Sequence, residues 1–494
     1  MLSRFKSALM NAVSSNNDLT LLHNNDCNIG IVPDYGNANN GATTTSCVLL
    51  EAKPYSRPIF LGLTNEETQV SADHQVRPII VPRDSSRIPW CAGYAECINA
   101  GKSMWNEDQA AATRGDLILD GGHISLPYIM FSMFDGHAGY QVAVSSRLHL
   151  HRIILEKLQA IPGKIFFNTD NQQEDVSTIR ERELVIGAIE LAYRQMDEMV
   201  DIQARNGGGG CTAITVLFLN GLIYAAGAGD SRAVIIYGNK QRALTSDHTP
   251  DTETNRVRGL VLGLKGSELL KGHFTPLEFA ERPQSSDVGT MVLYREPYMT
   301  GWAYKKLVGS DLKMPLVSGH GKRSRVMGTI GVTRGFGDHG LQAANTGVYI
   351  KPFLSSQPEI QIFKVDDDDL TERDCIIIAT DGLWDVVTIE ESGNILRKVM
   401  APDTPSWEYR LVMAAQELVQ AARGRLIDRI WRGKPIKVNN GPEEYLPMAS
   451  VDDISVFVIP LHPYIGEHKQ WKKSIQQSTR EHLNDYSIKS TNSI

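Results

Sequence analysis

Acidic residues follow or interrupt several apolar segments of this chain, close to where each segment ends. Asp135 comes directly after the apolar run 128–134, and Asp381 follows the run Ile376 to Ala379. The other acids in comparable places are Glu107, Asp108, Asp230, Asp452 and Asp453. A single acid at such a place is most simply a turn former that bonds to nearby backbone. Acids at the ends of five separate segments favour one shared site on the loops of a rigid sheet.

The chemistry that such a set could perform depends on cations. Carboxylates repel one another, so they converge only when a positive charge neutralises them. Hard oxygen ligands suit Mg²⁺ or Mn²⁺, and the sequence offers no paired histidines or cysteines for a softer metal. The residue types therefore predict a carboxylate metal site and leave its reaction open, although phosphoryl hydrolysis is the commonest chemistry of a metal pair of this kind.

The bulk composition excludes some classes of protein. A chain of 494 residues with 42 % hydrophobic residues can build one large core with appendages. Its net charge of −7 argues against a nucleic-acid binder, which usually carries a basic excess. The six cysteines form no CxxC pair and are typical of free thiols in a reducing compartment. Without an apolar run of the roughly 18 to 20 residues that a membrane span needs, we expect a cytoplasmic protein.

The chain divides into four regions by composition. Residues 1–14 have the pattern of a short amphipathic helix with a basic polar face, which favours contact with an anionic membrane surface. Docking on the protein's own body and disorder are the alternatives. Residues 15–89 are polar and then proline-rich, and are predicted to be flexible up to about 55 and extended beyond it. A globular domain over 90–462 and a polar, loosely held tail over 463–494 complete the chain.

Within the globular region, apolar runs predict strands and longer periodic patterns predict helices. Strands are expected at 128–134, in a meander over 211–238 with Asn220-Gly221 as its hairpin turn, and at 374–382 and 452–460. Helices are expected at 141–160, 183–203 and 407–422. Strand runs mixed with amphipathic helices indicate sheets covered by helices. Segments 161–182 and 258–325 fit neither pattern and are interpreted as insertions.

At its acidic residues the sequence resembles the PPM, or type 2C, metal-dependent serine/threonine protein phosphatases. The resemblance covers about residues 93 to 460 and rests on eight motifs in the order of the family. These are Asn106-Glu107-Asp108, Asp135-Gly136-His137-Ala138-Gly139, Gly210-Cys211-Thr212-Ala213, Gly229-Asp230-Ser231-Arg232, Asp247-His248-Thr249-Pro250, Thr333-Arg334-Gly335-Phe336-Gly337-Asp338, Thr380-Asp381-Gly382-Leu383-Trp384-Asp385 and Asp452-Asp453-Ile454-Ser455-Val456. Finer details, such as TIGVTRGFGDH and YIKPFLSS, resemble the animal branch lettered H, J and M.

The resemblance implies the fold and a two-metal centre. The implied fold is of the α+β class: a four-layer αββα sandwich, in which helices flank two antiparallel sheets and the insertion at about 258–325 forms an enlarged flap. Two Mg²⁺ or Mn²⁺ ions would lie at one end of the sandwich. By position, Asp135 would bridge both ions, the carbonyl of Gly136 would bind one, and Asp381 and Asp452 would complete one ion's shell.

The remaining acids are carried over in supporting roles. Glu107 and Asp108 match residues that hold metal-bound waters. Asp230 and Asp385, together with Asp381, match a weaker third metal site. A water shared by two cations loses its proton near neutral pH and can attack phosphorus in line.

Two cationic side chains have implied roles in catalysis. His137 is placed to protonate the departing serine or threonine oxygen as the general acid, with a structural bond to the adjacent loop as the alternative. Ser103 stands where the family has its phosphate-binding arginine, so Lys102 is the candidate replacement, without the bidentate fork of arginine. Asp453 stands where asparagine is common, which leaves the choice of ligand between Asp452 and Asp453, with Asp452 favoured by register.

The resemblance also suggests partners. Members of the branch act on phosphorylated Rab GTPases, and its amphipathic N-terminus supports peripheral contact of residues 1–14 with intracellular membranes. The main alternative is a pseudophosphatase that binds phosphoproteins without turnover. That reading predicts a lost metal ligand, and Ser103 is the one feature in its favour. A carboxylate-metal nuclease is a second alternative, against which the acidic charge balance speaks.

Overall fold

The computed structural model describes residues 54–122, 124–167, 180–201, 204–205, 209–263, 266–364, 370–401, 406–424 and 449–475. Residues 1–14, which we predicted to form a helix, residues 15–53, which we predicted to be a tether, and the end of the tail lie outside these ranges. Within the described ranges, no helix has the length and apolar content needed to cross a bilayer.

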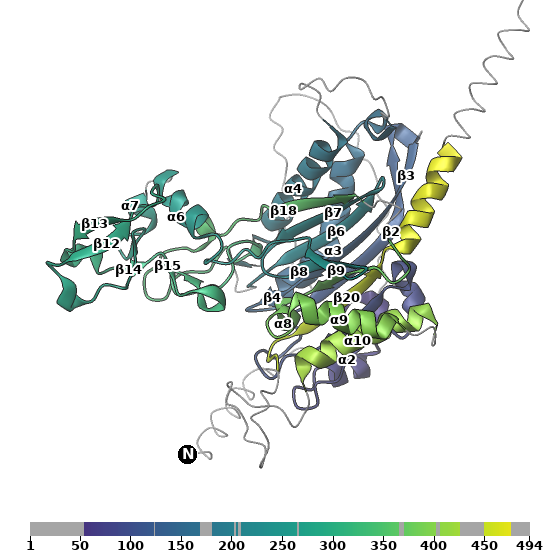
Figure 1. Ribbon diagram of the computed structural model, residues 1–494, viewed down its shortest axis with the longest axis horizontal. Helices are drawn as coiled ribbons and strands as arrows, with labels where there is room; N and C mark the ends of the chain where they lie inside the picture. Colours follow the sequence, from purple (N-terminus) through teal and green to yellow (C-terminus); the bar gives the residue numbers. More distant parts are fainter. Residues whose placement is uncertain are drawn as a thin grey trace, which may run out of the picture. The chain divides into compact units, whose positions relative to one another are not determined.

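The centre of the fold is a pair of five-stranded antiparallel sheets (Figure 1). One sheet has the order β1 (Gly93–Cys97), β20 (Ile454–Pro460), β19 (Cys375–Ala379), β8 (Arg232–Tyr237) and β9 (Lys240–Ala243). The other has the order β18 (Glu359–Lys364), β7 (Leu222–Ala228), β6 (Ala213–Leu219), β3 (Ile124–Phe134) and β2 (Gln109–Leu119). The strands expected at 128–134, 374–382 and 452–460 and the meander over 211–238 are therefore confirmed.

The apolar runs of these strands are continuous because both faces of each sheet are covered. In β6, Ile214, Val216 and Phe218 point into the core between the two sheets. The alternate residues Leu217 and Leu219 point into the core beneath the outer helices. Successive side chains of a strand face opposite ways, so a strand buried on both sides needs apolar residues at every position.

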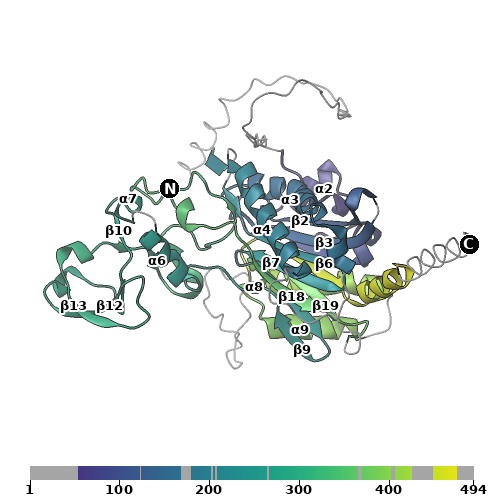
Figure 2. The same cartoon turned by 90° about the horizontal axis from the view of Figure 1, so that it is seen from above.

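Helices cover the outer face of each sheet. The helices α3 (Gln141–Gln159) and α4 (Glu181–Met199) share a core with β2, β3, β6 and β7. The helices α9 (Ile389–Met400) and α10 (Trp407–Arg423) share a core with β1, β19 and β20. In Figure 2, α3 and α4 lie on one side of the sheets and α9 on the other. The α+β class and the αββα layering are confirmed, although α9 was not predicted.

The hairpin between β6 and β7 forms at the predicted dipeptide. Asn220 and Gly221 have φ values of 47° and 79°, so both adopt the left-handed conformation of a two-residue type I′ turn. Asparagine and glycine tolerate that conformation better than other residues.

Two terminal segments are more tightly packed than their composition suggests. Residues 54–91, expected to be extended, contain the helix α2 (Asn65–Ser71) and bury Arg57, Phe60, Leu61 and Arg77 against the body. From 462 to 475 the chain forms a helix, and its Tyr464 is 6 % exposed and bonds to the hairpin at Gly221 and Leu222. The chain is therefore not extended throughout 56–89 as expected, and the tail is not loosely held over 463–475, because scattered apolar and arginine side chains anchor otherwise polar segments.

The flap has a small core of its own. The core joins Val257 and Val261 of α6 (Thr254–Gly263) with Phe274 and Leu316, and it continues through residues 326–354. It therefore extends beyond the insertion boundary of about 325 that the sequence suggested. The flap also contains a three-stranded sheet of β11 (Glu278–Phe279), β12 (Met291–Arg295) and β13 (Ala303–Lys306).

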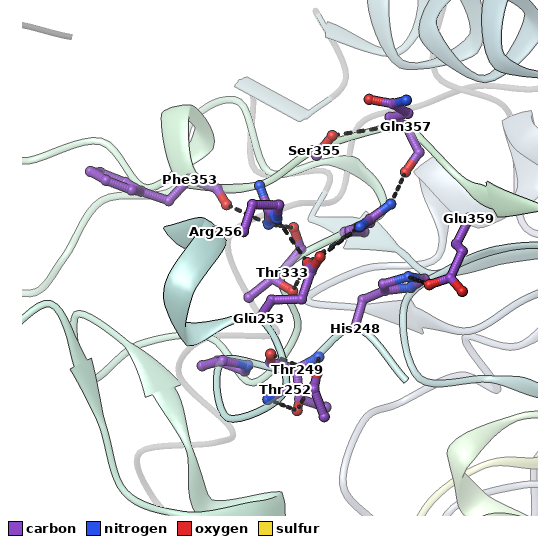
Figure 3. Close-up of polar contacts among 12 residues, drawn as sticks. His248, Thr249, Thr252, Glu253, Arg256, Thr333, Phe353, Ser355, Gln357 and Glu359 are labelled. Carbon is purple, nitrogen blue, oxygen red and sulfur yellow. Dashed lines mark hydrogen bonds and ion pairs between the residues drawn. The ribbon is translucent and has the colours of Figure 1, made fainter. Parts of the chain in front are cut away.

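Glu253 ties the start of the flap to the segment that leaves it (Figure 3). Its carboxylate accepts hydrogen bonds from Thr333 Oγ1 at 2.6 Å and Arg334 Nη2 at 2.6 Å, and it pairs with Arg256 Nε at 3.0 Å. Arg256 in turn donates to the carbonyl oxygens of Thr333 and Phe353. Burial acts to raise the pKa of Glu253, but the bonds from Arg334 and Thr333 outweigh it and lower the pKa to about 2.

We expect Glu253→Gln to lower the melting temperature most strongly near neutral pH. The pKa in the folded state lies below its ordinary value of 4.5, so the stabilisation is complete above about pH 4.5 and is lost as the pH falls toward 2. The cost at pH 7 should be about 1 to 2 kcal/mol, since the site is partly screened by solvent. The difference in melting temperature between the wild type and Glu253→Gln should be smaller at pH 4 than at pH 7. An equal difference at the two pH values would contradict this role of Glu253.

Candidate functional site

The sheet topology brings the acidic loops to one end of the sandwich. Strand β20 lies between β1 and β19, so Asp452, which precedes β20, lies beside Asp381, which follows β19, and beside the loop that follows β1. That loop carries Glu107 and Asp108. Asp135 lies between β3 and the short strand β4 (Gly136–His137). The predicted gathering of acids from separate segments is thus what the strand order produces.

Close packing of two loops depends on a glycine. A Cβ atom on Gly382 would lie 1.8 Å from the carbonyl oxygen of Asp453, a distance at which no side chain fits. Gly382 therefore lets the loop of Asp381 approach the loop of Asp452 and Asp453.

The electrostatics show that these carboxylates lie within reach of one another. Burial raises the pKa of Asp135 well above its ordinary value, and Asp381, Asp108 and Asp452 raise it further. Burial and the charges of Asp230 and Asp452 do the same for the pKa of Asp381. An acidic cluster of this kind is destabilised by its own charge unless protons or cations bind to it.

Asp230 and Asp385 lie toward the edge of this group. Burial, followed by the charges of Asp247 and Asp385, raises the pKa of Asp230 to about 6. Asp385 is exposed, and its carboxylate pairs with Lys322 of the flap at 2.5 Å. The two acids thus lie close enough for their charges to interact.

The donor set fits a divalent cation. Oδ2 of Asp108 accepts a hydrogen bond from Thr380 at 2.9 Å, whereas its buried Oδ1 has no partner of acceptable geometry among the described residues. A buried carboxylate oxygen without a partner is costly, and an ion or its bound water would satisfy it. As they stand, no three acidic, histidine or cysteine side chains in the described ranges are close enough to form a ready-made metal site.

Asp452 and Asp453 have different surroundings. Asp453 is buried, and its oxygens accept hydrogen bonds from the backbone N–H groups of Asn99 at 2.7 Å and Glu107 at 3.0 Å. Both of its oxygens thus hold the loop after β1 in shape. Asp452 is half-buried and pairs through Oδ2 with Lys102. This arrangement supports Asp452 as the candidate ligand and gives Asp453 a structural role.

Asn99 shapes the loop that presents Lys102. Its side-chain oxygen accepts hydrogen bonds from the backbone N–H groups of Gly101 at 3.0 Å and Lys102 at 2.7 Å. Ser103 is bound inside the same loop, where its hydroxyl donates to the carbonyl oxygen of Trp105. Burial acts to lower the pKa of Lys102, but Asp452, Asp135 and Asp381 outweigh it and raise the pKa. Lys102 is therefore a cation on the acidic cluster, whereas Ser103 is occupied within its own loop.

His137 is held by an aspartate that our sequence reasoning did not single out. Its Nε2 lies 2.9 Å from Oδ2 of Asp338, in the loop that follows β17 (Phe336–Gly337). Burial acts to lower the pKa of His137, but Asp338 outweighs it and raises the pKa. Asp338 stood within a quoted motif, but its role depends on a contact across 201 residues. The neighbouring Ala138 has a φ of 55°, a conformation easier for the glycine that many family members have there.

Comparisons with known proteins identify the family of this chain. The sequence model of the family described as "Protein phosphatase 2C" matches residues 123–268 and 315–426. Protein phosphatase 1H from Homo sapiens is 38 % identical over 480 residues, covering 83 % of this chain and 91 % of that protein. Protein phosphatase 1J from Homo sapiens is 37 % identical over 464 residues, covering 86 % and 89 % of the two chains. Protein phosphatase 1M from Homo sapiens is 36 % identical over 438 residues, covering 83 % and 92 %.

These relatives bear the letters of the branch that the finer motifs indicated, and the similarity runs over most of the chain. The chain therefore belongs to the protein phosphatase 2C family and is a protein serine/threonine phosphatase.

Proposed function

We propose that this phosphatase hydrolyses phosphoserine and phosphothreonine in proteins with two Mg²⁺ or Mn²⁺ ions held by Asp135, the Gly136 carbonyl, Asp381 and Asp452. The observation that carries the proposal is the electrostatic coupling of Asp135, Asp381 and Asp452, which stand on three separate loops. A weaker third ion would use Asp230 and Asp385 together with Asp381. When bound, the cations supply an activated water and neutralise the charge of the phosphoryl group.

The chain's own groups have distinct tasks in this scheme. Glu107 accepts a hydrogen bond from the Gly139 N–H at 2.9 Å, which fixes its carboxylate beside the His137 loop. Asp108 has a second buried oxygen, Oδ1, that could accept a hydrogen bond from a water. Asp338 raises the pKa of His137, which favours the protonated imidazole, and that proton can pass to the departing alkoxide. Asp338 keeps the imidazole in place for that transfer.

Lys102 is proposed to bind the substrate phosphate in place of the missing arginine. We expect Lys102→Met to raise the KM for a phosphopeptide about tenfold, because it removes a charge-assisted hydrogen bond. Lys102→Arg should keep KM close to that of the wild type, since it preserves the charge. Steady-state kinetics would decide, and a Met variant with unchanged KM would show that Lys102 serves only as the ion-pair partner of Asp452.

The branch resemblance supports phosphorylated Rab GTPases as substrates, and the exposed basic stretch His320, Lys322 and Arg323 offers charge near the acidic site. It also supports a cytoplasmic enzyme that contacts membranes through residues 1–14. Comparing release of phosphate from a panel of phosphorylated Rab proteins and unrelated phosphoproteins would test the substrate. Sedimentation of the full chain and of a chain lacking residues 1–14 with anionic vesicles would test the membrane contact.

The test of the function itself uses three substrates with Mn²⁺: p-nitrophenyl phosphate, a phosphoserine peptide and a nucleic acid. We expect hydrolysis of the first two only. Binding of the phosphopeptide without turnover would favour the pseudophosphatase alternative, and cleavage of the nucleic acid would favour the nuclease.

A further inference from the structure

We propose that residues 54–91, here called the N-terminal segment, position the loops of the candidate metal site. Two buried arginines of this segment, Arg57 and Arg77, act as positioning residues. Their side chains donate hydrogen bonds to the backbone of the two loops that carry Glu107, Asp108 and Asp452. The inference rests on the metal-site roles proposed above for those acids.

Arg57 donates hydrogen bonds to the loop backbone on both sides of Glu107. Its Nη1 donates to the carbonyl oxygens of Asn106 at 3.1 Å and Asp108 at 2.6 Å. The charge is balanced by Glu96 of β1, which accepts from Nε at 2.9 Å and from Nη2 at 2.5 Å. Arg57 is 7 % exposed and Glu96 is 1 % exposed, so these bonds face little competition from water. Arg57 thus fixes the position of the Glu107 backbone relative to strand β1.

Arg77 likewise donates hydrogen bonds to the backbone of the loop that carries Asp452. Its Nη1 and Nη2 donate to the carbonyl oxygens of Ser450 at 2.8 Å and Asp452 at 2.9 Å, and its Nε donates to Ile98 O at 2.6 Å. Arg77 is 1 % exposed. One side chain therefore joins the end of β1 to the loop that carries the proposed ligand Asp452.

Further contacts of the N-terminal segment fall on the Lys102 loop. The ring nitrogens of His74 lie 3.0 Å from Asn99 O and 3.3 Å from Met104 O. The ring of Tyr55 packs on that of Trp105, with centroids 4.5 Å apart. The segment thus contacts the loop after β1 from its first residues to its last and also reaches the Asp452 loop.

Arginine suits this task better than any other side chain. Its planar guanidinium offers five N–H donors in a fixed fork, so a single group can hold several carbonyl oxygens in one geometry. Outer groups that orient metal ligands typically cost 10- to 100-fold in metal affinity when they are removed. The two arginines bond to the backbone carbonyl oxygens of these loops and not to the acidic side chains, so their proposed role is to position the site.

The flap contains a matched control. Arg258 is 2 % exposed and also bonds one carboxylate and two carbonyl oxygens, those of Glu278, Pro276 and Arg295. Arg258→Met therefore removes a similar set of bonds, and none of these three partners of Arg258 belongs to the loops of Glu107, Asp108 and Asp452. Arg57→Lys keeps the charge balance with Glu96 but loses the fork, and it serves where Arg57→Met fails to fold.

The experiment titrates Mn²⁺ into each full-length variant by calorimetry and records melting curves and hydrolysis of p-nitrophenyl phosphate. We expect Arg57→Met and Arg57→Lys to bind Mn²⁺ about 10- to 100-fold more weakly than the wild type. Arg258→Met should lose stability and keep the wild-type affinity for Mn²⁺.

Three outcomes would count against the inference. Wild-type affinity in both Arg57 variants would overturn it and leave the proposed metal site intact. An equal loss of affinity in Arg258→Met would also overturn it, because the effect would then follow from general destabilisation. A wild-type protein that binds no Mn²⁺ would overturn the proposed site itself, and the inference with it.

Discussion

Replacing Asp135 with asparagine should reduce the metal-dependent hydrolysis of a phosphopeptide by at least about 1,000-fold. The proposed role of Asp135 as the bridge between both ions gives it the largest expected effect of any side chain, since its loss weakens both ion sites at once. Initial rates with saturating Mn²⁺, compared for the wild type and Asp135→Asn, measure the effect.

A second readout separates this loss from misfolding. Burial and four neighbouring carboxylates raise the pKa of Asp135, so removing its charge relieves repulsion in the metal-free protein. The melting temperature of metal-free Asp135→Asn should therefore equal or exceed that of the wild type, and added Mn²⁺ should raise it less. Activity that survives the substitution would contradict the bridging role, and a sharply lowered melting temperature would show that Asp135 supports the fold.

Replacing His137 with alanine should slow hydrolysis of a phosphoserine peptide by about 100- to 10,000-fold, the range typical of general acid catalysis. The serine alkoxide needs a proton as it leaves, and the imidazole held by Asp338 at 2.9 Å is the proposed donor. The effect on p-nitrophenyl phosphate should be much smaller, because p-nitrophenolate departs without protonation. Rates of the two proteins on the two substrates, measured at one Mn²⁺ concentration, give the comparison.

An equal loss on both substrates would contradict the role of general acid. It would show instead that His137 maintains the loop between Asp135 and Gly139. A matched control is Asp338→Asn, which keeps a hydrogen-bonding partner but removes the charge that raises the pKa of His137. In this variant, as in His137→Ala, hydrolysis of the phosphoserine peptide should slow more than hydrolysis of p-nitrophenyl phosphate. The loss of rate on the peptide should be smaller than in His137→Ala.

The parts of the fold that depend on local patterns could be predicted from sequence. The Asn220-Gly221 turn follows from the backbone freedom of those two residues, and the strands of the meander follow from apolar runs buried on both faces. The positions of Asp135 and Asp381 at strand ends were also visible, because the apolar run before each acid is unambiguous.

Features that depend on contacts between distant residues could not be predicted. The N-terminal segment is proline-rich and polar, so its composition suggested an extended chain. Its order depends on Arg57 bonding 39 to 51 residues away and on Arg77 bonding up to 375 residues away. The same limit hid Tyr464 in the last helix, whose hydroxyl bonds to Gly221 across 243 residues.

The candidate site shows the same division. Eight motifs identified the acids, but the different roles of Asp452 and Asp453 became clear only from their partners. Asp453 binds the backbone of Asn99 and Glu107, whereas Asp452 faces Lys102. The pairing of His137 with Asp338 could also be seen only in the structure, because nothing in either sequence motif indicates that the two residues are in contact.

Titration of Mn²⁺ into chelator-treated wild-type protein and Asp135→Asn, followed by calorimetry, tests the central claim most directly. If the converging carboxylates form a two-metal centre, the wild type will bind two ions per chain and regain phosphopeptide hydrolysis as they bind. The variant will lose at least one of the two binding events. A wild-type protein that binds no Mn²⁺, or that hydrolyses the phosphopeptide at full rate after chelation, would contradict the account.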